Sequence, residues 1–260
     1  MNAEKRQKFI ENFIMSGARV EIKTLSNELN VSEMTIRRDL RKLEEQGLIK
    51  RVFKGTELDS IKNSDLIDDS LKKRIVQNTE EKKLIGKIAA TFVKDGDIIA
   101  LDASTTVYEM CKHLKDKKIT IITNSIRVCL YFSMVKNVDI ILAGGNLRYG
   151  TLSLIGPDVG TNFRKYYTNK IFISGKALSY ENKLTDINAF EIETKKALIE
   201  NTKEVFVLLD HSKLNKTSLI KACDLKNISK LIIDGMKEFS DQEEKVIQKI
   251  KNEGVEVIIA

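Results

Sequence analysis

Hydroxyls, glycines and a lysine gather in four short polar segments that together have the chemistry of a phosphate site. The segments are Asp102-Ala-Ser-Thr-Thr106, Thr123-Asn-Ser125, Ala143-Gly-Gly145 and Asp210-His-Ser-Lys213. Hydroxyls, exposed backbone N–H groups and lysines bind anions, and paired glycines let the backbone approach a ligand closely. Serine and threonine also cap helices for structural reasons alone. The four segments indicate an anion site if the fold brings them to one place.

Alternating strands and helices are expected to position these segments. Apolar strands are predicted at 98–101, 119–123, 138–142, 170–174, 205–209, 231–233 and 255–259. Helices are predicted at 79–93 with Thr79 as its cap, from the first polar segment to about 115, from the second to about 135, and at 187–202 and 240–252. This alternation is typical of an α/β, mostly parallel sheet covered on both faces. Ligands bind outside the carboxyl ends of such strands, where the four segments fall.

A second region, residues 31–41, has the pattern of a DNA-reading helix. Ser32 can cap this helix after the preceding one ends at Asn30-Val31. The i, i+4 and i+7 spacing places Ile36, Leu40 and Leu43 on one buried face. The outward hydroxyls and arginines can reach phosphates and base edges in a major groove. For this helix taken alone, a solvated amphipathic helix with ordinary surface arginines is the alternative.

The neighbouring segments complete a winged helix-turn-helix. A first amphipathic helix is predicted at 3–16, a very short strand at 20–22 and a second helix at 24–29. After a glycine stop at Gly47, a strand at 48–53 and a Lys54-Gly55 turn form the wing. The predicted DNA-binding residues are Ser32, Thr35, Ile36, Arg37, Arg38, Arg41, Arg51 and Lys54.

Residues 5–56 resemble the N-terminal domain of DeoR-type bacterial transcriptional repressors. The shared positions are Arg6, Ile10, Val31-Ser32, Thr35-Ile-Arg-Arg-Asp-Leu40, Leu43-Glu44, Gly47, Ile49 and Arg51. The wing departs from the family, which usually has His-Gly-Gly where this chain has Phe53-Lys54-Gly55.

The rest of the chain resembles the DeoR-type effector domain, which shares its fold with ribose-5-phosphate isomerase and glucosamine-6-phosphate deaminase. The matching positions are Leu101-Asp102, Ser104-Thr-Thr106, Thr123-Asn-Ser125, Gly144-Gly145, Gly156, Glu191, Glu193-Thr-Lys195, Asp210 and Ser212-Lys213. The resemblance implies a Rossmann-like sensor of phosphorylated sugars that releases DNA when ligand binds. Ser104 replaces a family glycine, and Ser174-Gly175-Lys176 also departs from the commoner small-residue version.

These motifs predict the effector-binding residues, although several have a plainer alternative. Asp102 orients a sugar hydroxyl or caps the loop backbone, Lys176 contacts an acidic ligand or lies in solvent, and Glu191 borders the pocket or forms an i, i+4 surface pair with Lys195. Asp210-His211-Ser212 contains triad residue types, but consecutive residues rarely align as a triad. The predicted set is Asp102, Ser104, Thr105, Thr106, Asn124, Ser125, Gly144, Gly145, Lys176, Glu191 and Lys213.

Composition is consistent with an intracellular binding protein. The 260 residues carry a net charge of +7, which favours polyanion partners, and are 42% hydrophobic. Three widely spaced cysteines support neither a metal site nor a disulfide framework, and no segment resembles a signal peptide or a membrane span. We expect a cytoplasmic chain with a DNA-binding domain at 1–58, a partly docked connector at 59–78 and an effector-sensing domain at 79–260.

Together these features predict a sequence-specific transcriptional regulator without a cofactor or metal, most naturally a repressor of carbohydrate-metabolism genes that a phosphorylated sugar releases from operator DNA. A homo-oligomer, dimer or tetramer, is expected because one winged helix buries too little surface for strong specificity. Sequence leaves an activator open. An enzyme is the alternative to a regulator: a sugar-phosphate isomerase or deaminase with an accessory N-terminal module, since fold does not fix function.

Overall fold

Two compact units make up the chain, residues 1–61 and residues 62–260. The computed structural model describes Arg6, residues 22–45 and residues 71–260. The predicted wing, with Arg51 and Lys54, and all of the predicted first helix except Arg6 lie outside the described residues. Within those residues, no helix is long and apolar enough to cross a membrane.

The first unit contains the two helices of a helix-turn-helix, α2 (Ile22–Glu28) and α3 (Glu33–Glu45). Leu25 and Ile36 are fully buried, so each helix contributes to the core of the unit. The turn between the helices passes through Asn30, whose φ of 48° lies in the left-handed region that asparagine tolerates better than most residues. Both helices were predicted, but Ile22 begins α2 instead of ending a short strand, which corrects that assignment.

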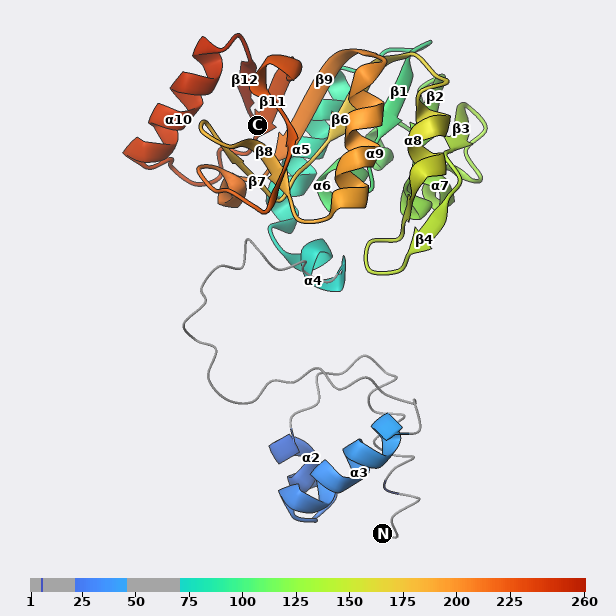
Figure 1. The fold of residues 1–260 in the computed structure, drawn as a ribbon, viewed down its shortest axis with the longest axis vertical. Helices are drawn as coiled ribbons and strands as arrows, with labels where there is room; N and C mark the ends of the chain where they lie inside the picture. The colour runs from blue at the N-terminus through green and yellow to red at the C-terminus, as the bar shows by residue number, and fades with distance from the viewer. Residues whose placement is uncertain (1–5, 7–21, 46–70) are drawn as a thin grey trace. The chain divides into compact units, whose positions relative to one another are not determined.

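A seven-stranded sheet forms the centre of the second unit (Figure 1). Its order is β12-β11-β9-β6-β1-β2-β3, and every neighbouring pair is parallel. This confirms the predicted parallel sheet, with small shifts at the strand ends. The strands are β1 (Ile98–Leu101), β2 (Ile119–Thr123), β3 (Val138–Leu142), β6 (Thr168–Ile173), β9 (Thr202–Leu209), β11 (Lys230–Ile233) and β12 (Glu256–Ile259).

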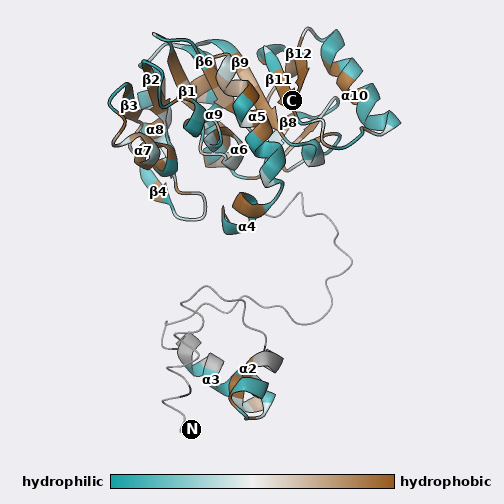
Figure 2. Cartoon of the chain, turned by 180° about the vertical axis from the view of Figure 1, so that it is seen from behind, coloured by the Kyte–Doolittle hydropathy of each residue, from teal (hydrophilic) through white to brown (hydrophobic). Residues whose placement is uncertain are grey.

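Two hydrophobic cores cover the two faces of the sheet. Successive strand residues point to opposite faces, so Ile99 and Leu101 pack in one core and Ala100 packs in the other. Figure 2 shows the apolar strands enclosed by helices whose outer surfaces are hydrophilic. One face carries α5 (Thr79–Thr91), α6 (Thr105–Tyr108) and α7 (Ile126–Phe132), and the other carries α8 (Pro157–Phe163), α9 (Ala189–Glu200) and α10 (Asp241–Asn252).

Several short elements were not predicted. A hairpin of β4 (Asn146–Arg148) and β5 (Ser153–Ile155) follows β3, and a small antiparallel sheet has the order β10-β8-β7. Its strands are β7 (Ala177–Ser179), β8 (Lys183–Asp186) and β10 (Ile220–Cys223). These strands have three or four residues that mix polar and apolar positions, so they show neither a period nor an apolar run. The single helix expected to reach about residue 115 is instead α6 followed by a 3-10 turn at Cys111–His113.

A short helix, α4 (Leu71–Val76), precedes α5 and lies within the segment predicted as a connector. Asn78, with φ 50° in the left-handed region, separates the two helices. Thr79 therefore does not cap α5 as predicted, since it is the first helical residue. Its hydroxyl donates back to the carbonyls of Ile75 and Val76, at 3.2 and 3.1 Å.

The three cysteines are all free. Cys111 and Cys223 are buried, and burial raises the pKa of each thiol to about 12. A thiol that stays protonated at neutral pH is a poor nucleophile, so these two side chains act as small apolar residues.

Candidate functional site

The strand order reverses between β1 and β6, which makes this the switch point of the sheet. From β1 the chain proceeds outward through β2 and β3, and then crosses to β6 on the other side of β1. Asp102 follows β1 and Ser174 follows β6, and the Ser174 backbone N–H donates to Asp102 Oδ2 at 2.9 Å. Ligands of parallel α/β sheets bind outside the carboxyl ends of the strands at such a point.

A cavity of about 180 Å³ opens at this switch point. Six of the eleven predicted effector residues line it, namely Asp102, Ser104, Thr105, Lys176, Glu191 and Lys213. Basic side chains outnumber acidic ones in its wall. The basic residues are Lys73, Arg74, Lys82, Arg148, Lys176, Lys195, Lys213 and Lys216, and the acidic ones are Asp102, Asp186, Glu191 and Asp210. The cavity therefore has the charge to attract an anion and the carboxylates to accept hydrogen bonds from hydroxyls.

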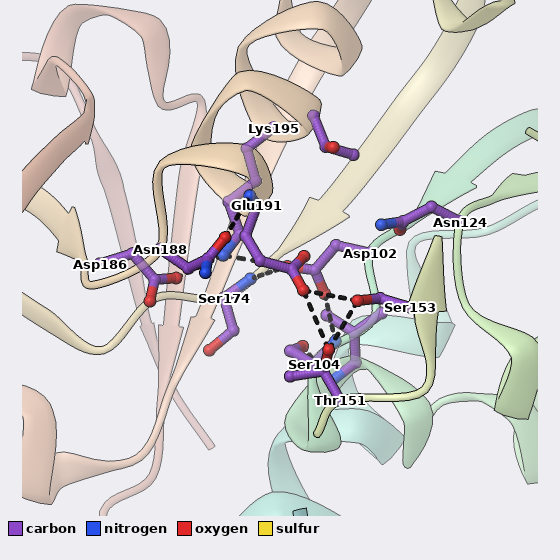
Figure 3. Close-up of polar contacts among 12 residues, drawn as sticks. Asp102, Ser104, Asn124, Thr151, Ser153, Ser174, Asp186, Asn188, Glu191 and Lys195 are labelled. Carbon is purple, nitrogen blue, oxygen red and sulfur yellow. Dashed lines mark hydrogen bonds and ion pairs between the residues drawn. The ribbon is translucent and has the colours of Figure 1, made fainter. Parts of the chain in front are cut away.

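Asp102 organises the loop after β1. Its Oδ1 accepts the backbone N–H of Ser104 at 2.9 Å, and its Oδ2 accepts that of Ser174 (Figure 3). Ser104 in turn caps α6 by accepting the N–H of Val107 at 3.2 Å. Burial raises the pKa of Asp102 above its ordinary value. The geometry supports the loop-capping alternative, since both carboxylate oxygens already accept backbone hydrogen bonds.

Lys195 is a buried cation of the cavity wall, with 6% of its surface exposed. Its Nζ lies 2.5 Å from Asp186 Oδ2 and 3.8 Å from Asp102 Oδ2. Burial alone lowers the pKa of a lysine, but Asp186, Asp102 and Glu191 outweigh that effect and raise the pKa of Lys195. The alternative in which Lys195 and Glu191 form a surface pair is wrong, because Lys195 is buried against the two aspartates.

Glu191 joins helix α9 to the β4–β5 hairpin. Its Oε1 accepts hydrogen bonds from Ser153 Oγ at 2.5 Å, Thr151 Oγ1 at 3.1 Å and Arg148 Nη1 at 3.3 Å (Figure 3). Asn188 caps the same helix by accepting the Glu191 N–H at 3.1 Å. Glu191 thus lies at the cavity wall and also holds the hairpin loop in place.

The segment after β9 brings Lys213 to the cavity. Lys213 Nζ lies 3.7 Å from Asp210 Oδ2, and Asp210 accepts hydrogen bonds from Asn78 Nδ2 at 2.7 Å and from the Ser212 hydroxyl. Burial acts to raise the pKa of Asp210, but Lys213, Ser212 and Asn78 outweigh it and lower the pKa. No triad forms, because Nδ1 of His211 lies 2.8 Å from Asp234 Oδ1 instead of facing Asp210.

Lys82, a residue of α5, also lines the cavity. Its Nζ donates to the carbonyl of Gln77 at 2.5 Å and to that of Arg74, which are the last carbonyls around α4. Burial, followed by the nearby charge of Lys213, lowers the pKa of Lys82 to about 8. An anion beside Lys82 would favour its charged form.

Five predicted effector residues lie outside the cavity wall. Thr106 is fully buried. Asn124 and Ser125 fix the loop after β2, where Asn124 Nδ2 donates to Leu154 O at 3.0 Å and Ser125 caps α7. The other two, Gly144 and Gly145, have φ values of 73° and 105° at the start of the hairpin. A Cβ on Gly145 would lie 2.5 Å from Val159 Cγ2, so close packing alone accounts for a glycine there.

Other lining residues escaped sequence reasoning. Lys73, Arg74 and Lys82 come from the segment predicted as a connector or from the following helix, and Arg148 comes from the unpredicted hairpin. Only Asp186-Ile-Asn188, at the start of the helix predicted at 187–202, gave a signal of the kind used for the other loops. In the part of the chain that the structure describes, no three His, Cys, Asp or Glu side chains form a metal-binding group.

The predicted DNA-binding face lies on α3. Ser32, Arg37 and Arg38 are exposed, and Thr35 is half-buried, with its N–H donating to Ser32 Oγ at 3.2 Å. Ile36 is fully buried, which corrects its assignment as a DNA-contacting residue: its side chain packs within the unit. No side-chain placement is described for Arg41.

An ion pair fixes the back of α3. Arg6 Nε lies 2.5 Å from Asp39 Oδ2, and both side chains are nearly inaccessible to solvent. Asp39 follows the two exposed arginines in sequence, so the motif contains a buried structural residue directly beside its outward-facing ones.

Bacterial repressors are similar to this chain over most of its length. The chain is 36% identical over 234 residues to the HTH-type transcriptional repressor GlcR of Bacillus subtilis, covering 90% of this chain and 89% of GlcR. It is 32% identical over 219 residues to the lactose phosphotransferase system repressor of Lactococcus lactis, covering 83% and 85%. Ribose 5-phosphate isomerase A of Methanocaldococcus jannaschii is similar at 18% identity and a TM-score of 0.40, over 54% of this chain and 56% of the isomerase.

Two family matches divide the sequence as its motifs do. Residues 6–62 match the DeoR-like helix-turn-helix domain, and residues 77–235 match the DeoR C terminal sensor domain. The sensor-domain match alone spans more than half of the chain. The protein therefore belongs to the DeoR family of transcriptional regulators and is not an isomerase or deaminase.

Proposed function

We propose that this regulator represses genes of carbohydrate metabolism and that a phosphorylated sugar releases it from operator DNA. The observation that carries the proposal is the cavity at the switch point, a small space lined by lysines, arginines, hydroxyls and carboxylates. A phosphorylated sugar has both kinds of group, an anion and several hydroxyls. The lactose phosphotransferase system repressor bears a name from sugar metabolism, which supports the same class of target genes.

The cavity suggests how such a ligand is held. Thr105, Lys213 and Lys176 would bind the phosphate, which accepts charge-assisted hydrogen bonds. Glu191 would orient the sugar hydroxyls, together with the loop that carries Ser104 and that Asp102 holds in place. Asn124, Ser125, Thr106, Gly144 and Gly145 would contribute indirectly, because they shape the loops behind the wall.

The DNA contact is proposed for the exposed face of α3. Ser32 and Thr35 lie at the start of the helix, and Arg37 and Arg38 follow within its first two turns. A recognition helix contacts base edges with its N-terminal residues. A homo-oligomer, dimer or tetramer, is proposed because two copies read two half-sites.

Fluorescence anisotropy tests both parts of the proposal. The full chain is titrated onto labelled DNA from upstream of its own gene, with random DNA of equal length as control, and then with hexose and pentose phosphates. We expect salt-sensitive, sequence-preferring binding that one sugar phosphate reverses. Equal affinity for both DNAs, or release by no phosphorylated sugar, would contradict the proposal.

Two single variants separate the sites. Arg37→Ala should weaken DNA binding and leave ligand binding intact, whereas Thr105→Val should weaken ligand binding and leave DNA binding intact. Thr91→Val is the control for the second variant, since it makes the same change at an exposed position of α5 away from the cavity. Loss of both functions in either variant would refute the two-site arrangement.

A further inference from the structure

Helix α4 is attached to the sensor domain by polar contacts. None of its residues is buried, and Val76 is 73% exposed. The side chain of Lys82 donates to the carbonyls of Arg74 and Gln77, and the Thr79 hydroxyl donates to two more. With little apolar burial to hold it, the helix depends on these hydrogen bonds.

The junction after α4 reaches the segment that follows β9. Asn78 Nδ2 donates to Asp210 Oδ1 at 2.7 Å and to Ser212 Oγ at 3.0 Å. Asp210, Ser212 and Lys213 all line the cavity, as do Lys73, Arg74 and Gln77 of α4 and its junction. The helix is therefore a wall of the candidate effector site, and Figure 1 shows it beside the end of the sheet.

Arg74 is the exceptional side chain of this wall. Its Nε and Nη2 are buried, yet neither has a hydrogen-bond partner among the described residues. A guanidinium presents its N–H groups in a planar fork that matches two oxygens of a phosphate, and a buried donor without an acceptor is destabilising. Both facts favour an anion at this position.

Neighbouring charges point the same way. Arg74 and Lys213 both lie close enough to Lys82 to disfavour its charged form, and Asp210 opposes them only in part. Lys82 and the two cations that repel it in the free protein would share one dianionic phosphate in the complex. Binding of such a group would relieve the repulsion and give Arg74 its acceptor.

We propose that Arg74 binds the phosphate of the effector, with Lys82 and Lys213 beside it, and that this contact fixes α4 against the sensor domain. This inference rests on the proposed function and assigns the response to the effector to one residue, Arg74, and one helix, α4. In chain order α4 is the first described element after the helix-turn-helix, so fixing it constrains the point where the chain enters the sensor domain. A ligand can shift the equilibrium between two states only through contacts that differ between them, and the Arg74 contact is one of these.

Isothermal titration calorimetry on the full chain tests the phosphate contact. The probes are glucose 6-phosphate, fructose 6-phosphate, fructose 1-phosphate, ribose 5-phosphate, inorganic phosphate and unphosphorylated glucose. For the phosphorylated probe that binds the wild type, Arg74→Gln should weaken binding by about tenfold to a hundredfold, while Arg74→Lys keeps part of the affinity. Lys72→Gln is the matched control, because Lys72 is an exposed cation of the same helix outside the cavity wall and should change nothing.

Hydrogen exchange of the α4 amides tests the coupling. The probe that binds should slow exchange across residues 71–78 in the wild type and in Lys72→Gln, but not in Arg74→Gln at the same fractional saturation. DNA affinity without ligand should be equal in all three proteins.

The outcomes separate the two proposals. Unchanged ligand affinity in Arg74→Gln, or equal α4 exchange with and without ligand in the wild type, would overturn this inference while the sugar-phosphate response stands. If ligand binding requires Arg74 but the ligand never changes DNA affinity, the proposed release from operator DNA is wrong instead. Failure of the wild type to bind any phosphorylated probe would overturn both.

Discussion

Replacing Lys195 with methionine should destabilise the sensor domain more than any surface charge change. Methionine keeps much of the length and apolar volume of the side chain but removes the ammonium that lies 2.5 Å from Asp186 and 3.8 Å from Asp102. Both carboxylates are then left without their main counter-charge. Removing one partner of a buried ion pair costs about 3–5 kcal/mol. For a domain of this size that corresponds to a fall in Tm of about 6–20 °C.

Differential scanning calorimetry at several pH values measures this change and identifies its cause. In the wild type the pKa of Asp186 is lowered, chiefly because Lys195 outweighs the effect of burial, so its ionised form stabilises the fold above the unfolded pKa and that contribution is lost as pH falls. In Lys195→Met the sign reverses, because the buried carboxylates now bind protons more tightly in the folded state. The variant should therefore regain stability as pH falls from 7 toward 5.

Two further variants control the experiment. Lys196→Met changes the next residue, whose ion pair with Glu193 lies at the surface, and should lower stability by no more than about 0.5 kcal/mol. Adding Asp186→Asn to Lys195→Met should restore part of the loss by removing one uncompensated charge. A Tm for Lys195→Met within 2 °C of the wild type, or no recovery on acidification, would refute the reasoning.

Three other predictions concern the hairpin, the cavity and the DNA-binding helix. Gly145→Ala should lower the free energy of unfolding, measured with denaturant, by about 1–3 kcal/mol. The φ of 105° is unfavourable for alanine, and the new Cβ would lie 2.5 Å from Val159 Cγ2. An unchanged unfolding midpoint would contradict this. Affinity for a phosphorylated sugar, measured by calorimetry, should fall severalfold as pH rises through about 8, since Lys82 then loses its charge, and Lys82→Gln should abolish that fall. Ser32→Asp should keep the cap of α3 and its thermal stability, because a carboxylate also accepts the cap hydrogen bond. It should nevertheless weaken DNA binding more than Ser32→Ala, because a carboxylate repels phosphate. Equal DNA affinities of the two variants would show that Ser32 does not contact DNA.

The sequence alone determined the elements that have a clear period or a specific motif. The seven strands of the parallel sheet were predictable because each is a short apolar run between helical patterns, as at Ile98–Leu101. The exposed positions of α3 were predictable because helical spacing separates Arg37 and Arg38 from the buried Ile36. Polar residues after β1 and β9 were predictable as cavity residues because parallel strands end at one edge.

Only the tertiary structure decided which polar residues share the cavity and which serve the fold. Asn124 and Ser125 have the same residue types as a binding loop, but their hydrogen bonds hold a hairpin and cap a helix. Arg74 lies in a segment without a clear period. It reaches the site because its short helix packs against α6, and the following Asn78 bonds to Asp210 after β9. Lys195 resembles a surface residue in sequence and is buried because the neighbouring Asp186 and Asp102 neutralise it. Periodicity reports which face of one element is apolar, whereas burial and ion pairing depend on neighbours distant in sequence, which are brought together only when the sheet forms.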